Sequence, residues 1–219
     1  MEYSLDEFLL QDSVTEINRI VSETKAPMAG NCLYRHHRNF ELHLTNKEIL
    51  RRNLFKLCNS AKSILEIGFN AGHSCALYLY SNPEIEVVAF DLCSHSYTED
   101  CANYLSSRYN LVLHKGDSGH TIPNYNPGRT FDLIHIDGGH SQIQSLIDII
   151  NCKKLADANT LLIVDDTHLA GISKSIEYLR AHGLLLEVDY DKRGLGRTNL
   201  HRIFRYNPDF GYAYPGSEC

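Results

Sequence analysis

Three aspartates of this 219-residue chain follow two apolar segments that are typical of strands. Asp137 ends the segment 131–137, and Asp165, with Asp166 directly after it, ends the segment 160–165, 28 residues later. A strand–helix–strand unit takes about thirty residues, so the two ends would meet at one sheet edge, about 4.8 Å apart if the strands are neighbours. Carboxylates so close repel one another and raise each other's pKa unless a cation neutralises them. We therefore expect Asp137, Asp165 and Asp166 to bind Mg²⁺ or another divalent cation.

A histidine accompanies each end of this acidic group. His140 stands three residues after Asp137 and would face the same cleft, and its ordinary pKa of about 6.5 suits a general base. His168, three residues after Asp165, is a second candidate base. A cation beside such a base would help a hydroxyl group to lose its proton and would hold it in line for reaction. The alternative is that Asp165 or Asp166 caps the following helix while Thr167 caps another turn, and both interpretations can hold at once.

A second group of residues suits a nucleoside-containing cofactor. The segment 66–72 reads Glu-Ile-Gly-Phe-Asn-Ala-Gly at a predicted strand-to-helix turn, and Asp91 ends the next apolar run, 25 residues after Glu66. Glycines let the backbone approach a ligand, and an acid after the second strand can bind ribose hydroxyls. This spacing does not by itself separate S-adenosylmethionine (SAM) from NAD. Glu66, however, stands where an NAD site has its first glycine, and a carboxylate there would repel a pyrophosphate while suiting the ammonium and sulfonium groups of SAM. The plain alternative is a strand-to-helix turn with incidental glycines.

These residues stand in an alternating series of strands and helices. We predict strands at 63–68, 86–91, 110–114, 131–137 and 160–165, and helices at 72–80, 97–108, 141–155 and 172–182. The strands are almost continuously apolar, as in a parallel sheet covered on both faces. Two more predicted strands, 184–190 and 201–206, have no helix between them and should pair antiparallel. The expected fold class is α/β, a Rossmann-like seven-stranded sheet, mostly parallel with a C-terminal antiparallel hairpin, with helices on both faces.

The segment before the first strand has a different pattern. Residues 4–24 carry apolar positions at helical spacing and predict one or two short amphipathic helices, whereas residues 25–44 are typical of an irregular loop. Thr45 and Glu48 form a capping-box pattern that predicts a helix to about residue 58. We expect 1–58 to be an N-terminal helical extension with a substrate-side loop, and 59–219 to be the cofactor-binding domain. Two stretches are placed to contact a substrate, although the first can equally pack the extension: the aromatic loop with Tyr34, His36, His37 and Phe40, and Arg193–Arg197.

Composition narrows the classes of partner. The net charge of −6, with 27 acidic against 21 basic residues, does not favour nucleic acid as a partner. The seven cysteines contain no C-x-x-C pair, as expected for small buried side chains in a reducing compartment. The N-terminus is acidic, unlike a secretory signal, and no apolar run approaches the eighteen or so residues that span a membrane. We expect a soluble, cytoplasmic protein with no membrane partner.

Taken together, the motifs resemble those of class I methyltransferases. The resemblance is carried by Glu66–Gly72, Asp91, the turn Gly116-Asp117-Ser118 and Asp137-Gly138-Gly139-His140. The stretch 131–140 followed by 161–167 is similar to small-molecule O-methyltransferases related to catechol O-methyltransferase and to the macrolide-sugar O-methyltransferases. The resemblance covers about residues 60–206, and residues 1–58 match no family by their motifs. One departure is that Asp157-Ala158-Asn159 replaces the glycine-rich turn common before the fifth strand.

The resemblance implies a SAM site and an activity. The loop Gly68–Gly72 would hold the methionine part, Asp91 the ribose, and Asp117 with Ser118 the adenine. The whole predicted cofactor site is Glu66, Gly68, Asn70, Gly72, Asp91, Asp117, Ser118 and Asp137. The resemblance also implies that the three aspartates bind the cation and that His140 is the base. The implied reaction is methyl transfer to a hydroxyl of a sugar or other small molecule, with a catechol or phenol as the alternative acceptor. Related enzymes often pair through their N-terminal segments, so a homodimer is one arrangement the resemblance suggests.

Other classes of protein are alternatives to a small-molecule methyltransferase. An amino-methylating DNA or RNA enzyme would carry an Asn-Pro-Pro-Tyr-like tetrapeptide after the fourth strand, where this chain has Asp-Gly-Gly-His. An NAD-type oxidoreductase and a non-catalytic domain of the same fold remain as alternatives, because fold alone does not settle function.

Overall fold

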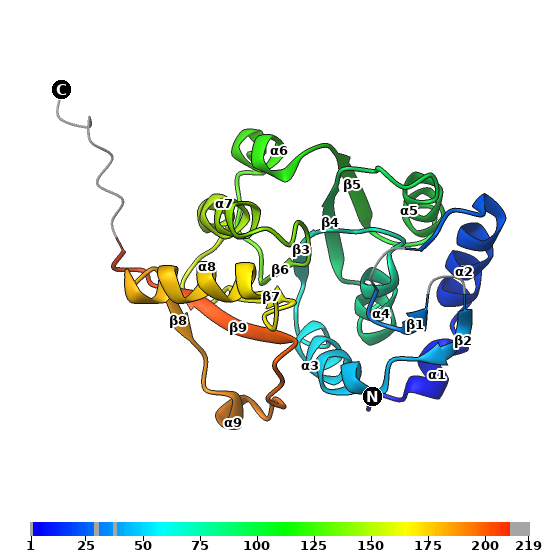
Figure 1. Ribbon diagram of the computed structural model, residues 1–219, viewed down its shortest axis with the longest axis horizontal. Helices are drawn as coiled ribbons and strands as arrows, with labels where there is room; N and C mark the ends of the chain where they lie inside the picture. The colour runs from blue at the N-terminus through cyan, green and yellow to red at the C-terminus, as the bar shows by residue number, and fades with distance from the viewer. Residues whose placement is uncertain (1, 29–30, 37–38, 211–219) are drawn as a thin grey trace.

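The computed structural model describes residues 2–28, 31–36 and 39–210 (Figure 1). Its centre is a sheet of seven strands in the order β5-β4-β3-β6-β7-β9-β8. The strands are β3 (Ser63–Ile67), β4 (Glu86–Asp91), β5 (Leu111–Lys115), β6 (Leu133–Ile136), β7 (Leu161–Asp165), β8 (Leu185–Glu187) and β9 (His201–Tyr206). The first five are parallel, and β9 runs antiparallel to both β7 and β8. The predicted fold class is confirmed, and so is the C-terminal antiparallel hairpin.

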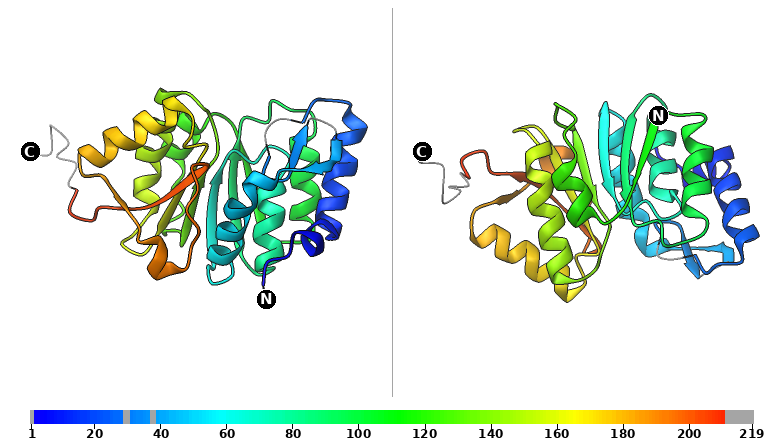
Figure 2. Two further views of the ribbon diagram at one scale, coloured as in Figure 1. Left: turned by 60° about the horizontal axis from the view of Figure 1, so that its bottom comes forward. Right: turned by 90° about the horizontal axis from the view of Figure 1, so that it is seen from above.

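Helices cover both faces of the sheet, which explains why the central strands are apolar at successive positions. Every residue of β3, β6 and β7 is buried. Side chains alternate between the two faces, so Ile64 and Ile163 join one apolar core while Leu65 and Leu162 join the other. One face carries α3 (Glu48–Cys58), α4 (His73–Ser81) and α5 (Thr98–Ser106), and the other carries α6 (Ser118–Asn124), α7 (Gln142–Cys152) and α8 (Ala170–Ala181), as the views in Figure 2 show.

The first part of the extension folds as two helices, as predicted. They are α1 (Leu5–Leu9) and α2 (Asp12–Thr24), and α2 packs beside α4 and α5. The prediction of an irregular loop at 25–44 is wrong, because β1 (Tyr34–His36) and β2 (Asn39–His43) form an antiparallel hairpin. The side chain of Tyr34 packs the hairpin against α4, because its ring lies 5.1 Å from that of Phe40 on β2 and 5.5 Å from that of His73 on α4. His37 and the side chain of His36 lie outside the described residues.

The end of the extension is organised by one buried arginine and not by a capping box. Thr45 lies in the 3₁₀ turn η1 (Thr45–Lys47) and makes no capping hydrogen bond, so the predicted capping box is wrong, whereas the predicted helix is present and ends at Cys58. Glu48 contacts Arg51 instead, at 3.0 Å. Arg51 is fully buried and donates to the hydroxyl of Tyr3 and to the carbonyls of Cys32 and Leu44, at 2.8–2.9 Å. These bonds join three separate stretches of the extension, whose apolar residues share a core with the sheet.

Two short helices were not predicted. The helix α6 begins at a turn where the Asp117 side chain accepts the amide hydrogen of Gly119. The helix α9 (Tyr190–Arg193) begins where Asp189 accepts two backbone amides, so β8 ends at Glu187, before the predicted boundary of 190. Both helices begin at an aspartate that caps its own turn. Within the described part of the chain, no helix is both long and apolar enough to cross a membrane.

Candidate active site

A cavity of about 490 Å³ opens at the carboxyl ends of the central strands. Ligands of open α/β sheets bind at this edge. Eight of the predicted site residues line it: Gly68, Asn70, Asp91, Asp117, Ser118, Asp137, His140 and Asp166. Three others, Glu66, Gly72 and Asp165, do not. The cavity therefore joins the residues predicted for the cofactor with most of those predicted for the cation.

The floor of the cavity depends on a glycine at the end of β3. The backbone at Gly68 has φ +95°, and a Cβ atom there would lie 2.0 Å from the carbonyl oxygen of Asp137. Any other side chain would push the ends of β3 and β6 apart, because that contact is backbone. Gly72 starts α4, and no side chain caps this helix at its N-cap. A helix N-terminus without a side-chain cap can offer its first N–H groups to a ligand.

Asp91 is held in place before any ligand arrives. One carboxylate oxygen accepts the amide hydrogen of Asn70 at 2.8 Å, and the other accepts that of Cys93 at 2.7 Å. Both residues have positive φ, 53° and 54°. The carboxylate therefore lies in the cavity in one orientation, as an acid that accepts ribose hydroxyls requires.

The far end of the cavity is a polar corner between α6 and α7. Ser118 donates from its hydroxyl to Asp148 at 2.7 Å, and the amide of Gln144 donates to both side chains. Burial raises the pKa of Asp148. Because the side chain of Asp117 caps Gly119 and that of Ser118 is bonded to Asp148, these two residues give the corner its shape.

Two of the predicted carboxylates meet His140 at the near end. One ligand atom each from Asp137, His140 and Asp166 lie within 4.8 Å of one another, and we call these three residues the pocket cluster. His140 Nε2 lies 3.0 Å from a carboxylate oxygen of Asp166. Asp166 faces the cavity because its backbone has φ +54°, which turns the chain sharply after β7. Two carboxylates and an imidazole are a donor set that suits a divalent cation such as Mg²⁺ or Mn²⁺.

Burial and neighbouring charges shift the pKa values of all three residues of the pocket cluster. Burial, reinforced by Asp165, raises the pKa of Asp137 to about 8. The hydrogen bond to Asp166 raises the pKa of His140. Although burial opposes it, the bond from His140 lowers the pKa of Asp166. An acid that resists ionisation beside other carboxylates is one that a bound cation would stabilise in its charged form.

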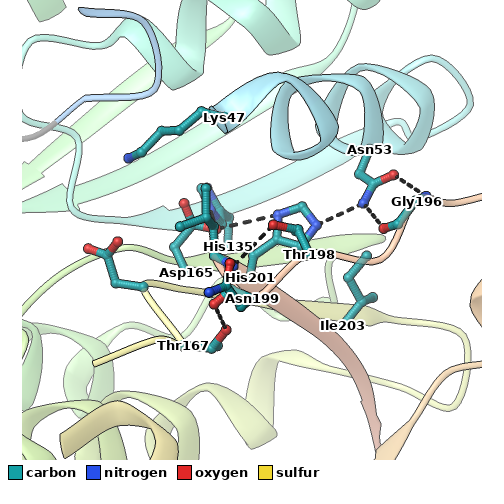
Figure 3. Close-up of polar contacts among 12 residues, drawn as sticks. Lys47, Asn53, His135, Asp165, Thr167, Gly196, Thr198, Asn199, His201 and Ile203 are labelled. Carbon is teal, nitrogen blue, oxygen red and sulfur yellow. Dashed lines mark hydrogen bonds and ion pairs between the residues drawn. The ribbon is translucent and has the colours of Figure 1, made fainter. Parts of the chain in front are cut away.

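Asp165 faces the interior and does not join the pocket cluster. One of its oxygens lies 3.2 Å from His135 Nε2 and 3.7 Å from His201 Nδ1, and the side chain is 4 % exposed (Figure 3). The expected meeting of three carboxylates is thus incomplete, because buried histidines on β6 and β9 attract the third. Burial lowers the pKa of His201 to about 4. Burial alone would lower that of His135 too, but the carboxylates of Asp165 and Glu66 raise it to about 10.

The capping alternative for these aspartates is wrong. The helix α8 follows Leu169 and has no side-chain cap. The hydroxyl of Thr167 donates to the carbonyl of Asn199 at 2.8 Å, so it ties β7 to the segment before β9 (Figure 3). His168 is 40 % exposed and 3.9 Å from Asp166, but it does not line the cavity.

Glu66 lies behind the cavity. Its side chain is fully buried, accepts a hydrogen bond from Tyr78 at 2.8 Å and lies 3.7 Å from His135. This burial separates the carboxylate from the cavity. The predicted contact of Glu66 with the SAM ammonium group is not tested by this arrangement and stays a prediction. The predicted substrate rim Arg193–Arg197 also lies off the lining of this cavity.

The extension supplies two lining residues that the sequence patterns did not single out, Asn31 and Lys47. The ammonium of Lys47 donates to the carbonyl of Asn31 at 3.1 Å. Figure 3 shows the Lys47 side chain extending from the turn that leads into α3. No local signal marks Lys47, because it reaches the cavity only once the extension folds against the sheet.

Comparisons with known proteins agree with this arrangement. Residues 65–167 match the family model of a methyltransferase domain. A methyltransferase from Podospora anserina, solved with S-adenosylhomocysteine, is similar at a TM-score of 0.65 and 14% identity over 90% of this chain and 89% of that one. An O-methyltransferase from Bacillus cereus is similar at 0.62 and 18% identity, over 92% and 96% of the two chains. A TDP-rhamnose 3'-O-methyltransferase of calicheamicin biosynthesis is similar at 0.58 and 16% identity, over 94% and 100%. Among curated proteins, none matches this chain by sequence.

The strand order and the glycine loop at the end of β3 define a Rossmann-like fold of the class I methyltransferase type. The match of residues 65–167 to a methyltransferase domain agrees with the activity that the motifs predicted, SAM-dependent methyl transfer. Its fold is that of SAM-dependent O-methyltransferases.

Proposed function

We propose that this enzyme transfers a methyl group from SAM to a hydroxyl of a sugar or other small molecule, assisted by a divalent cation and by His140 as the base. The observation that carries the proposal is the pocket cluster, which lies in the same cavity as Asp91 and the glycine loop. The likeness to a TDP-rhamnose 3'-O-methyltransferase supports a sugar hydroxyl as the acceptor.

Different residues of the cavity would bind different parts of SAM. The loop from Gly68 to Asn70 would hold the methionine part, and Asp91 would bind the ribose hydroxyls. Asp117 and Ser118 would flank the adenine in the polar corner. The methyl group of a cofactor held in this way would point toward the pocket cluster, because the cluster closes the other end of the cavity.

Transfer from the SAM sulfonium to an oxygen is a direct displacement, so the chain must supply alignment and proton removal. The Nε2–H of His140 faces Asp166, which leaves Nδ1 as the atom that accepts the hydroxyl proton. Asp166 orients the ring and, by raising the pKa of His140, strengthens the base. Asp137 and Asp166 would hold the cation, and Asp165, the third predicted ligand, lies behind them. A divalent cation at this position would lower the pKa of the acceptor hydroxyl and fix its oxygen.

A sugar hydroxyl is the preferred acceptor because it is only weakly acidic. An aliphatic hydroxyl is far less acidic than a phenol and gains most from a cation and a base acting together. Catechols are the alternative acceptor. The absence of a nucleic-acid partner and the homodimer both stay predictions, the first motivated by the net charge of −6.

The test is a turnover assay on the purified protein. The enzyme is incubated with SAM and with two acceptor panels, nucleotide-linked sugars and catechols, and the formation of S-adenosylhomocysteine is measured with EDTA and after Mg²⁺ is restored. We expect Mg²⁺-dependent turnover with a sugar. Turnover with catechols alone would replace the acceptor class, and full activity in EDTA would remove the cation from the proposal.

A further inference from the structure

A chain of buried polar side chains runs beneath the pocket cluster, on the face of the sheet covered by α3 and α4. Its members, which we call the buried chain, are Asn53, His201, Asp165, His135, Tyr78 and Glu66. None of them lines the cavity, and none is more than 4 % exposed. Figure 3 shows Asn53, His201 and Asp165 in succession, linked by dashed contacts. A polar network this deep in a core requires an explanation, because each unpaired group would be costly.

The proton on His201 is fixed by Asn53. The amide oxygen of Asn53 accepts the backbone N–H of Gly196 at 2.8 Å, and its NH₂ group donates to the Gly196 carbonyl at 2.7 Å. The same NH₂ group lies 2.9 Å from His201 Nε2, which must therefore accept. The ring then carries its proton on Nδ1, and Nδ1 is the atom that faces the Asp165 carboxylate at 3.7 Å.

His135 approaches the same oxygen from the other side. Tyr78 donates its hydroxyl proton to Glu66 at 2.8 Å, so the contact of 2.5 Å between its oxygen and His135 Nδ1 requires a proton on that nitrogen. The other ring nitrogen, Nε2, lies 3.2 Å from Asp165. One oxygen of Asp165 thus faces two imidazoles that come from two different strands, at 3.2 and 3.7 Å, and makes a hydrogen bond to neither among the described residues.

Asp165 and Asp166 are neighbours that face opposite ways. Asp165 points inward, toward the two histidines, whereas Asp166 turns outward through a backbone with φ +54° that non-glycine residues rarely adopt. Next along the chain, the Thr167 amide donates to the Leu200 carbonyl at 3.1 Å. The turn that presents Asp166 to His140 is therefore anchored on both sides, by Asp165 before it and by Thr167 after it.

We propose that His201, with Asn53 behind it, is a positioning residue for the cation site: by holding Asp165 from the interior, it fixes the end of β7 from which Asp166 is presented. The inference rests on the proposed function for the cation and deepens it. Residues that orient ligands from behind are known to change metal affinity without touching the metal.

The test compares four proteins by their binding of Mn²⁺, measured by electron paramagnetic resonance of the free ion. They are the wild type and the variants His201→Leu, His201→Asn and Ile203→Ala. The Asn side chain can place an N–H close to the position of Nδ1, whereas Leu cannot. Ile203 is a fully buried residue on the same strand and the same face, so its variant is a control for loss of packing alone. The melting temperature and the binding of S-adenosylhomocysteine are recorded for each.

We expect His201→Leu to weaken Mn²⁺ binding by about 10–100-fold. His201→Asn should restore most of the affinity, and Ile203→Ala should lower the melting temperature with the affinity unchanged. Equal losses in the Leu and Ala variants, or no loss in either, would overturn the inference. Absence of Mn²⁺ binding by a wild type that still binds S-adenosylhomocysteine would overturn the cation part of the proposed function and this inference with it.

A second readout needs no cation. The ¹⁵N chemical shifts of the histidine rings distinguish the two neutral tautomers. We expect His201 to carry its proton on Nδ1 in the wild type and to lose this single form in Asn53→Leu. A proton on Nε2 in the wild type would contradict the role given to Asn53, whatever the protein binds.

Discussion

The pocket cluster and the buried chain use the same residue types for different purposes, on the two sides of the end of β7. In the pocket cluster, Asp137 and Asp166 lie against a single histidine that is more than half exposed. In the buried chain, Glu66 and Asp165 are enclosed with His135, and the tyrosine and asparagine complete the contacts. The first group faces a cavity, where a ligand can complete its contacts, while the second is enclosed in the core and away from the cavity. Acidic residues in a sequence therefore indicate a cation site only when the fold places them at a cavity.

The largest effect that separates the two regions is expected for the base. His140→Gln should lower kcat by about 10²–10⁴-fold, because proton removal from the acceptor is lost while the cofactor contacts remain. His168→Gln is the matched control, since His168 lies near Asp166 but off the cavity. Steady-state kinetics with the acceptor found in the turnover assay measure both. Equal losses of kcat in the two variants would contradict the role of His140 as the base.

The second effect is a pH dependence of cation binding. Asp137, with its pKa raised to about 8, carries a proton at neutral pH in the free protein, and a bound cation must displace it. Mn²⁺ affinity should therefore fall as the pH drops below 8, by at most about tenfold per unit, and should level off above that pH. Titrations between pH 6 and about 9 give the profile, and an affinity that is flat across this range would refute the assignment of Asp137.

The sequence could predict the sheet and the position of the site, but not the division between these two regions. The strand at 86–91 was predicted to the residue because an apolar run lies there between two acids. The sequence predicted Asp165 as a cation ligand because it shows the neighbour of this residue, Asp166, and does not show its cross-strand partner. That partner is His201, brought opposite Asp165 by the antiparallel pairing of β9. Pairing between segments 36 residues apart leaves no local signal.

The extension was harder to predict for the same physical reason. The hairpin at 34–43 has few strand signals of its own, and its order comes from Tyr34 packing on Phe40 and on His73 of α4. Lys47 likewise lines the cavity as part of the extension, whose separate stretches Arg51 joins by its bonds to Cys32 and Leu44. Tertiary contacts determine the structure of these segments more strongly than their local propensity does.

The third effect concerns the buried chain and should appear in stability. Tyr78→Phe removes the hydroxyl that joins Glu66 to His135 and leaves both groups without that partner, at a cost of about 1–3 kcal/mol in the free energy of unfolding. Tyr80→Phe is the control, because its hydroxyl bonds to Glu7 at an exposed site. Urea denaturation at neutral pH measures both variants. A loss no larger for Tyr78 than for Tyr80 would mean that the buried contacts are not important for stability.

The smallest effect is expected for Lys47. Its positive charge helps to lower the pKa of Asp166 and also opposes the rise at Asp137. A cation at the pocket cluster would be repelled by it, so Lys47→Met should tighten Mn²⁺ binding by a few-fold, an effect that high salt should reduce. Lys56→Met is the control, because the Lys56 ammonium donates to the Gly194 carbonyl, outside this cavity. Weaker binding in the Lys47 variant would show that this lysine supports the site.

The most direct test is a calorimetric titration of Mg²⁺ into the protein saturated with S-adenosylhomocysteine, for the wild type and for Asp137→Asn. Saturation with S-adenosylhomocysteine in both proteins would show that the cofactor site is intact. We predict one Mg²⁺ site in the wild type and none in the variant, because the pocket cluster loses one of its two carboxylates. Equal heats in both proteins, or no Mg²⁺ heat in the wild type, would contradict the claim that the pocket cluster is a cation site.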